Sequence, residues 1–241
     1  SGAELILLTH GHIDHSGDLA RMNLEFSKPI KLMIPYQIES EVKNMIQSYY
    51  KLNNKYDKNN TLENKYEIKT VEPYKSYDIK LNNRQYVIDV FQCYHSVPTL
   101  SYGISEKKQR LKPEYAILSQ TEIIELRKNG IEVTQEQIVP IIVYNGDTTI
   151  QVFKDPKNCN IFTFPIIMIE STLFGTEDEP SKATKDGHIH WDHLRPFVVS
   201  HPNIKFVLYH FSTRYKDNEI YDYFETDKKT YDYDNITVWL G

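Results

Sequence analysis

The sequence contains little cysteine and no long apolar run. Only Cys93 and Cys159 are present, and two cysteines cannot build the disulfide framework of a small secreted protein. No stretch has the length and apolarity of a transmembrane helix, and nothing resembles a signal peptide. We therefore expect an intracellular, cytoplasmic protein with reduced thiols and no membrane partner.

An excess of positive charge is also lacking. The chain carries 28 Lys and Arg residues against 33 Asp and Glu residues, which gives a formal net charge of −5. This balance excludes a generally basic nucleic-acid-binding surface, so any RNA contact must be local. At 241 residues the chain can form one sizeable αβ domain with a real core, and we expect residues 1–241 to be that single domain.

The most informative segment that is present is residues 9–15, which read THGHIDH. His10 and His12 stand two apart, so at the end of an extended strand both would project to the same side. Asp14 and His15 follow in a loop and can face a second ion. Neutral imidazole and carboxylate are the ligands that zinc takes when it keeps a position open for water. We predict that this segment contributes ligands to two neighbouring metal ions.

Apolar periodicity predicts helices over residues 38–49 and 121–128, the second ending at Gly130, and a closing helix over residues 219–224. Residues 51–69 indicate a poorly ordered connector without chemistry. Asn82-Asn83 is typical of a hairpin turn. Strands are expected at residues 4–8, 77–81, 86–93, 138–144, 164–169, 204–209 and 236–240.

Several of these strands deliver a polar residue where they end. The residues are His95, Asp147, Glu170 and His210. Each is weak evidence alone, because a histidine after a strand or a Gly-Asp-Thr turn is common. Apolar strands that repeatedly end in polar residues build an active site along one sheet edge. Their order along the chain, together with the segment at residues 9–15, therefore favours one shared site.

The THGHIDH segment resembles the HxHxDH signature of the metallo-β-lactamase superfamily. Three further stretches resemble tRNase Z, particularly its short form: residues 169–174 (IESTLF), 187–190 (GHIH) and 210–215 (HFSTRY). The resemblance implies an α/β (α+β) fold, the αββα sandwich of that superfamily. Relatives place a few strands before the signature, so we expect N-terminal strands to be missing and the chain looks truncated at its start.

The resemblance also implies two Zn²⁺ ions per chain and a hydroxide between them that attacks a phosphodiester. Its ligand set is His10, His12 and His95 on the first ion, Asp14, His15 and His210 on the second, and Asp147 as the bridge. Asp14 would additionally orient the nucleophile and accept its proton. Glu170 and His188 match the pair that protonates the leaving oxygen, because an alkoxide leaves poorly unless an acid hands it a proton.

Substrate contacts are less specific in the sequence. Arg214 could hold a phosphate or pair with a carboxylate. Lys107, Lys108 and Arg110 lie in the one compact basic run, residues 107–112, which either faces RNA or is a solvated face. The Gly- and Pro-rich arm by which bacterial tRNase Z grips tRNA is not evident.

The leading interpretation is a zinc-dependent endoribonuclease that removes the 3′ trailer of precursor tRNA, and the family resemblance implies a homodimer. A broader metallohydrolase that acts on other RNA, small phosphodiesters or β-lactams is a second interpretation, because the same dinuclear site attacks each of these electrophiles. A third is an inactive relative that binds RNA as a scaffold.

Overall fold

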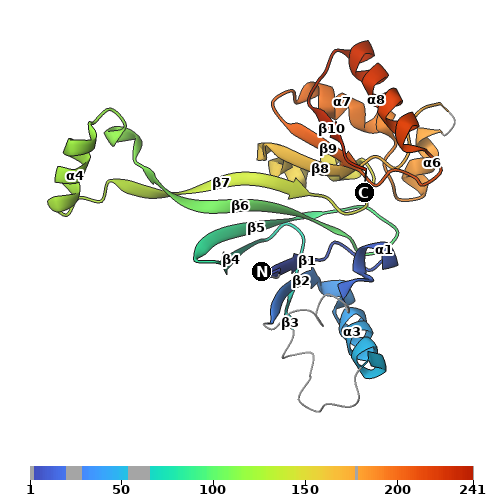
Figure 1. The fold of residues 1–241 in the computed structure, drawn as a ribbon, viewed down its shortest axis with the longest axis horizontal. Helices are drawn as coiled ribbons and strands as arrows, with labels where there is room; N and C mark the ends of the chain where they lie inside the picture. Colours follow the sequence, from blue (N-terminus) through green and yellow to red (C-terminus); the bar gives the residue numbers. More distant parts are fainter. Residues whose placement is uncertain (1–2, 20–28, 54–65, 177–178, 241) are drawn as a thin grey trace.

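The computed structural model describes residues 3–19, 29–53, 66–176 and 179–240, which form two β-sheets flanked by helices (Figure 1). The smaller sheet has three parallel strands in the order β1 (Leu5–Leu7), β2 (Ile30–Pro35) and β3 (Tyr66–Val71). The larger sheet has the order β10-β9-β8-β7-β6-β5-β4, antiparallel from β4 to β7 and parallel from β7 to β10. Its strands are β4 (Ser76–Leu81), β5 (Arg84–Gln92), β6 (Leu100–Leu111), β7 (Thr134–Tyr144), β8 (Ile166–Glu170), β9 (Lys205–Tyr209) and β10 (Ile236–Val238).

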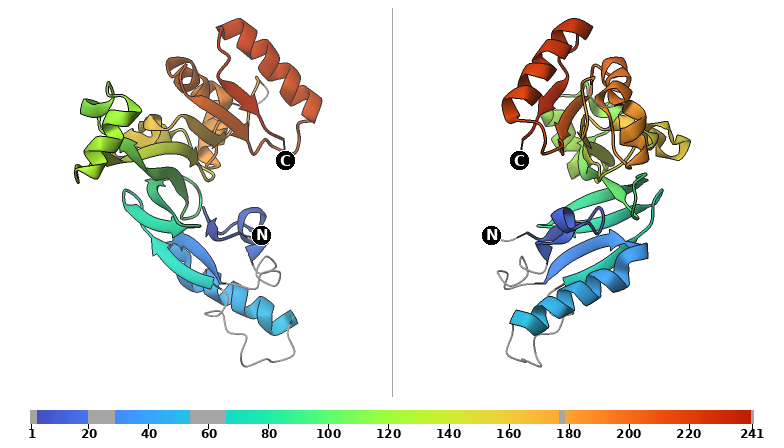
Figure 2. Two further views of the ribbon diagram at one scale, coloured as in Figure 1. Left: turned by 60° about the vertical axis from the view of Figure 1, so that its left-hand side comes forward. Right: turned by 90° about the vertical axis from the view of Figure 1, so that its right-hand side faces the viewer.

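Helices lie on the outer side of the smaller sheet and around the β8 to β10 end of the larger sheet. Figure 2 shows α3 along the outer side of the smaller sheet, and Figure 1 shows α6, α7 and α8 gathered around β8 to β10. The α-helices are α1 (Ile13–Ser16), α3 (Glu39–Asn53), α4 (Gln120–Lys128), α5 (Gln151–Lys154), α6 (Pro180–Lys185), α7 (Trp191–Ser200) and α8 (Asp217–Tyr231). The 3-10 helices are η2 (Tyr36–Ile38), η4 (Pro113–Tyr115) and η5 (Pro156–Thr163).

Three apolar cores hold these layers together. One core joins α3 to the smaller sheet, with Val42 and Ile46 of the helix buried against Ile30, Leu32 and Ile34 of β2. The second lies between the sheets and contains Met33, Val71, Ile88, Val90 and Tyr102. The third joins the larger sheet to α7 and α8 and contains Ile167, Phe206, Trp191, Leu194 and Phe224. The layers therefore follow the expected order of helix, sheet, sheet and helix.

Most elements expected from apolar patterning are confirmed. The hairpin of β4 and β5 turns at Asn82 and Asn83, which both have positive φ, as a tight two-residue turn requires. The strands expected near residues 138–144, 164–169 and 204–209 appear as β7, β8 and β9. The closing helix α8 is longer than the residues 219–224 that were expected.

Other expectations are wrong or incomplete. Residues 66–69, expected in a poorly ordered connector, belong to β3, while residues 54–65 of that connector lie outside the described residues. Asp14 and His15, expected in a loop, lie in α1. Strand β6 and helix α7 were not predicted, because the outer half of β6 is rich in charge and α7 contains Pro196.

Strands β6 and β7 extend well beyond their neighbours and form a protruding arm, defined here as residues 105–138, with α4 at its tip (Figure 1). Ser119 and Glu122 form a capping box that begins α4, and no residue of α4 is buried. The arm has neither the glycine nor the proline content sought in the sequence, which is why it was not recognised.

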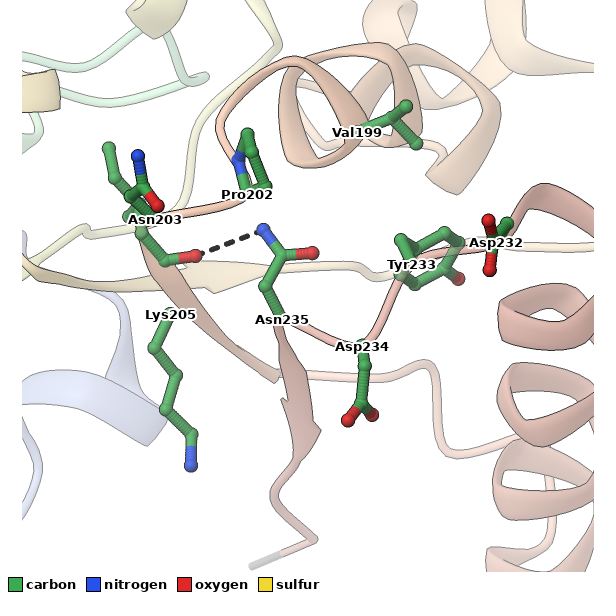
Figure 3. A pocket seen from close by; sticks show the side chains of 9 residues that line it. Val199, Pro202, Asn203, Lys205, Asp232, Tyr233, Asp234 and Asn235 are labelled. Atoms are coloured by element: carbon green, nitrogen blue, oxygen red, sulfur yellow. Dashed lines mark hydrogen bonds between the residues drawn. The ribbon is translucent and has the colours of Figure 1, made fainter.

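None of the helices in the described part of the chain has the length and apolarity needed to cross a membrane. A pocket of about 470 Å³ lies where β9 and β10 begin, and Val199, Pro202 and Lys205 line part of it (Figure 3). The Asn235 amide in this pocket donates to the carbonyl oxygen of Ile204, so it holds the local loops together.

Candidate metal centre

The candidate ligands gather where the chain leaves the ends of several strands. His10 and His12 follow β1, Asp14 and His15 lie in α1, His95 follows β5, Asp147 follows β7 and His210 follows β9. The segment before His10 is anchored to β6, because the amide of Leu100 donates to Thr9 O at 3.0 Å and the Tyr102 hydroxyl donates to Leu8 O at 2.6 Å. These two hydrogen bonds hold the segment before His10, which follows a strand of the smaller sheet, against β6 of the larger sheet.

Gly146 allows Asp147 to approach the histidine segment. A Cβ at Gly146 would lie 2.7 Å from the Thr9 Cβ and 2.7 Å from the Thr99 Cγ2, so no larger residue fits there without movement. On the other side, the amide of Tyr94 donates to Thr148 Oγ1 at 2.9 Å, which holds the segment before His95 beside Asp147.

Seven side chains form two adjoining clusters of donor atoms. His10, His12, His95 and Asp147 place one donor atom each within 4.8 Å of one another, and Asp14, His15 and His210 do the same. One oxygen of Asp147 joins the clusters. Its Oδ2 lies 3.8 Å from His10 Nε2, 3.9 Å from His95 Nε2, 3.5 Å from His15 Nε2 and 3.4 Å from His210 Nε2.

Several of these donors have no other partner. His10 Nε2, His15 Nε2 and Asp147 Oδ1 are buried and make no hydrogen bond. Buried polar atoms are nearly always paired, so three orphaned atoms that converge on one place indicate that a ligand completes them. Imidazole nitrogens and a carboxylate oxygen together suit a divalent cation such as zinc. The residues present therefore fit two metal ions.

Two of these residues are in the protonation state that binds metals. Burial, aided by the neighbouring His15, lowers the pKa of His10 to about 3, so the ring is neutral at physiological pH. Burial acts to raise the pKa of Asp147, but the close contact with His15 and the charges of His210 and His15 prevail and lower it to about 2. Neutral imidazole and ionised carboxylate are the forms that bind metals.

Backbone and hydroxyl groups fix the orientation of the outer imidazole nitrogens. His95 Nδ1 lies 2.8 Å from Gly187 O, and His10 Nδ1 lies 3.1 Å from Thr9 Oγ1. A ring that donates Nδ1–H to a carbonyl presents Nε2 as an acceptor on the metal side. Gly187 itself has φ +82°, a conformation that L side chains rarely adopt.

Glu170 and His188 form a pair beside the clusters. His188 Nδ1 lies 3.0 Å from Glu170 Oε1 and 3.1 Å from Oε2, and the glutamate is fully buried. Burial lowers the pKa of His188, but the hydrogen bond and charge of Glu170 outweigh it and the net effect is a raised pKa. The His188 ring centroid is 4.9 Å from that of His95 and 5.6 Å from that of His210. The Glu170–His188 pair therefore lies directly beside the candidate ligands.

The amino-acid sequence is similar to those of known proteins. The chain is 27% identical over 223 residues to tRNase Z TRZ1 of Arabidopsis thaliana, covering 91% of this chain and 76% of that protein. It is 25% identical to the chloroplastic tRNase Z TRZ2 of the same plant, covering 90% of this chain and 60% of that protein. No family model matches the chain.

Solved structures show the same fold. The metallo-β-lactamase fold protein YhfI of Bacillus subtilis superposes with a TM-score of 0.54 at 12% identity, covering 99% of this chain and 75% of that one. The short form of human tRNase Z gives a TM-score of 0.55 at 17% identity, covering 98% and 76%. This chain has the metallo-β-lactamase fold, and its sequence is similar to those of tRNase Z proteins. The resemblance and the fold expected from the sequence are confirmed.

The basic residues expected to contact substrate are dispersed in this metallo-β-lactamase fold. Lys107 lies on the arm, 2.9 Å from Asp78 and 3.7 Å from Glu136, and Lys108 lies 2.8 Å from Glu106. Arg110 is exposed further along β6. Arg214 is exposed, four residues after His210, and lies over the Tyr215 ring, 4.7 Å from its centroid. Arg214 thus follows a candidate ligand closely in sequence, whereas the basic run lies on the arm.

Sequence reasoning missed the residues that hold the ligands in place. Thr9, Thr172 and Gly187 each meet the Nδ1 atom of a candidate ligand. Gly187 was noted only as part of a motif, and its positive φ has no signal in the sequence beyond the residue type. His190, the second histidine of the GHIH stretch, caps α7 by accepting the amide of Asp192.

We predict that Gly187→Ala weakens metal binding by about 10- to 100-fold, as loss of a partner of a ligand typically does. The new Cβ would lie 2.8 Å from His95 Nδ1 and would displace the ring. Competition against a chromophoric chelator measures the affinity. Gly130→Ala is the matched control, because Gly130 has φ +78° but open space around it. Equal affinities in the two variants would show that Gly187 does not position His95.

Proposed function

We propose that this chain is a tRNase Z-like endoribonuclease that removes the 3′ trailer of precursor tRNA. The observation that carries the proposal is the Glu170–His188 pair, which lies against the clustered candidate ligands. Both sheets supply site residues, so we further propose that residues 1–241 act as one hydrolase domain. The kinship with proteins named tRNase Z supports the same substrate class.

We assign the clusters to two Zn²⁺ ions. His10, His12 and His95 would hold the first, Asp14, His15 and His210 the second, and Asp147 would bridge them. When bound, such a pair supplies an activated water and a positive charge that polarises the phosphate. The donor atoms that lack any partner in the described residues support this assignment.

The side chains of Asp14 and His188 would carry out the proton transfers. Asp14 is largely exposed, with 61% of its side chain accessible, so its carboxylate can orient an attacking water and accept its proton. His188 donates Nδ1–H to Glu170 and retains a second N–H on Nε2 when protonated. That Nε2–H can pass its proton to the 3′ oxygen of the tRNA as the bond to phosphorus breaks. The tRNA then ends in a 3′ hydroxyl.

Substrate contacts are proposed in two places. Arg214, which follows His210 by four residues and is held over Tyr215, can hold a phosphate beside the site. Lys107, Lys108 and Arg110 on the arm can meet RNA farther away, although Asp78, Glu106 and Glu136 offset much of the lysine charge. Among these three residues, Arg110 is therefore the best candidate for a contact with RNA.

The proposals for the oligomeric state and the cellular compartment rest on the similarity to tRNase Z. We propose an intracellular homodimer, since the tRNase Z resemblance implies one, and we favour the cytoplasm over an organelle although one relative is named as chloroplastic. Light scattering of the purified chain should give twice the mass of 28.4 kDa. A mass of one chain at micromolar concentration would contradict the dimer.

Incubation with a trailer-bearing precursor tRNA should yield a cut directly after the discriminator nucleotide. Activity should be lost with a chelator and restored by zinc, because removing the ions removes the nucleophile. Mapping both product ends by sequencing identifies the bond. Cleavage of a generic phosphodiester or a β-lactam but not of tRNA would favour the broader hydrolase, and a metal-free chain that binds tRNA without cutting it would favour the scaffold.

We predict that His188→Ala lowers phosphodiester turnover by about 10²-fold or more while zinc content stays unchanged. The reason is that the variant retains every candidate ligand but lacks the proton donor. Turnover on the precursor and metal analysis by mass spectrometry are measured on the same sample. His193→Ala, which changes a histidine outside the clusters, is the control. Unchanged turnover in His188→Ala would refute its role as the acid.

A further inference from the structure

Thr172 stands between the proton-donating pair and the second group of candidate ligands. It follows β8 by two residues, and its Oγ1 donates to Glu170 Oε2. The same oxygen lies 3.2 Å from His210 Nδ1 and 3.4 Å from His188 Nδ1. No other described hydroxyl is recorded within hydrogen-bond distance of both the glutamate and a candidate ligand.

The hydrogen-bond capacity of a hydroxyl settles the direction of these contacts. Thr172 has one O–H to give and two lone pairs to accept with. Thr172 Oγ1 also lies 3.1 Å from His210 O, but the carboxylate is the stronger acceptor and takes the proton, since charge-assisted hydrogen bonds are the shorter and stronger ones. The hydroxyl then accepts from His210 Nδ1–H. This leaves His210 Nε2 as a lone pair that faces Asp147 at 3.4 Å and Asp14 at 3.6 Å.

His210 depends on such support because its backbone is unusual. It has φ +57°, in the left-handed region that few residues other than glycine adopt. The main chain of Thr172 adds a second tether, because Thr172 O accepts from the amide of Ser212 at 3.0 Å. The two tethers flank His210 and fix both the turn and the plane of its ring.

We propose that Thr172 is a positioning residue that ties His210, as a ligand of the second ion, to the Glu170–His188 pair. The assignment rests on the proposed metal ligation, and it implies that one buried carboxylate orients both the proton donor and a metal ligand. Glu170 reaches His188 directly and His210 through the hydroxyl. Loss of the hydroxyl should therefore disturb metal binding as well as turnover.

The test compares Thr172→Val, which keeps the shape and removes the hydroxyl, with Thr172→Ser, which keeps the hydroxyl. Metal-free protein is titrated with Co²⁺ and followed by its visible absorption. In Thr172→Val one cobalt equivalent should bind about tenfold or more less tightly, while the other is unchanged. Thr172→Ser should bind both equivalents as the parent protein does. Thr172→Ala serves as a second hydroxyl-free variant if the valine variant does not fold.

Two results would overturn the proposal. One is parental binding of both cobalt equivalents by Thr172→Val or by Thr172→Ala, and the other is a serine variant that binds as poorly as the valine variant. Because cobalt binding is measured without RNA, the titration stands even if the parent protein fails to cut precursor tRNA. Failure of the tRNA assay thus rejects the proposed substrate, and failure of the titration rejects the role of Thr172.

Discussion

The site depends on the placement of one buried carboxylate among four imidazoles. Asp147 Oδ2 lies within 3.9 Å of a ring nitrogen from His10, His15, His95 and His210. Without cations, burial leaves Asp147 Oδ1 and two of the ring nitrogens unpaired. Orphaned buried polar groups are costly, and a bound cation removes that cost. Cations held by these residues would satisfy the unpaired atoms, so their binding would be energetically linked to folding.

The two sheets explain how residues so distant in sequence meet. The smaller sheet supplies the histidine segment, and the larger sheet supplies Asp147, Glu170 and His210 from neighbouring parallel strands. Parallel strands end at the same edge, so residues that follow β7, β8 and β9 are brought together by the pairing itself. The contact between Thr9 and Gly146 then closes the distance between the sheets. Packing of backbone, more than side-chain charge, sets the spacing of the donors.

The gathering of candidate ligands could be predicted from short motifs and from apolar strands that end in polar residues, whereas the order of the layers was implied by the family resemblance. His10, His12, Asp14 and His15 are adjacent in sequence, and the residues that follow strands share an edge by topology. Strand β6 and helix α7 escaped prediction, since charge along one and a proline in the other obscure their periodicity. Thr172 and Gly187 escaped for a different reason. Their roles arise from contacts with residues 16 to 92 positions away, which no local pattern records.

The same geometry bears on the role proposed for His188, which lies within reach of the candidate ligands. Asp147, His188 and His210 also place donor atoms within 4.8 Å of one another, so an imidazole at position 188 could in principle bind a cation. Glu170 opposes this outcome. It accepts from His188 Nδ1 as well as from the amides of Thr148 and Ile189, and it favours the protonated ring, which has no lone pair for a metal. Divalent ions bound nearby would lower the pKa of the ring. An imidazole that donates to a buried carboxylate is therefore suited to the proposed role of acid rather than to that of a ligand.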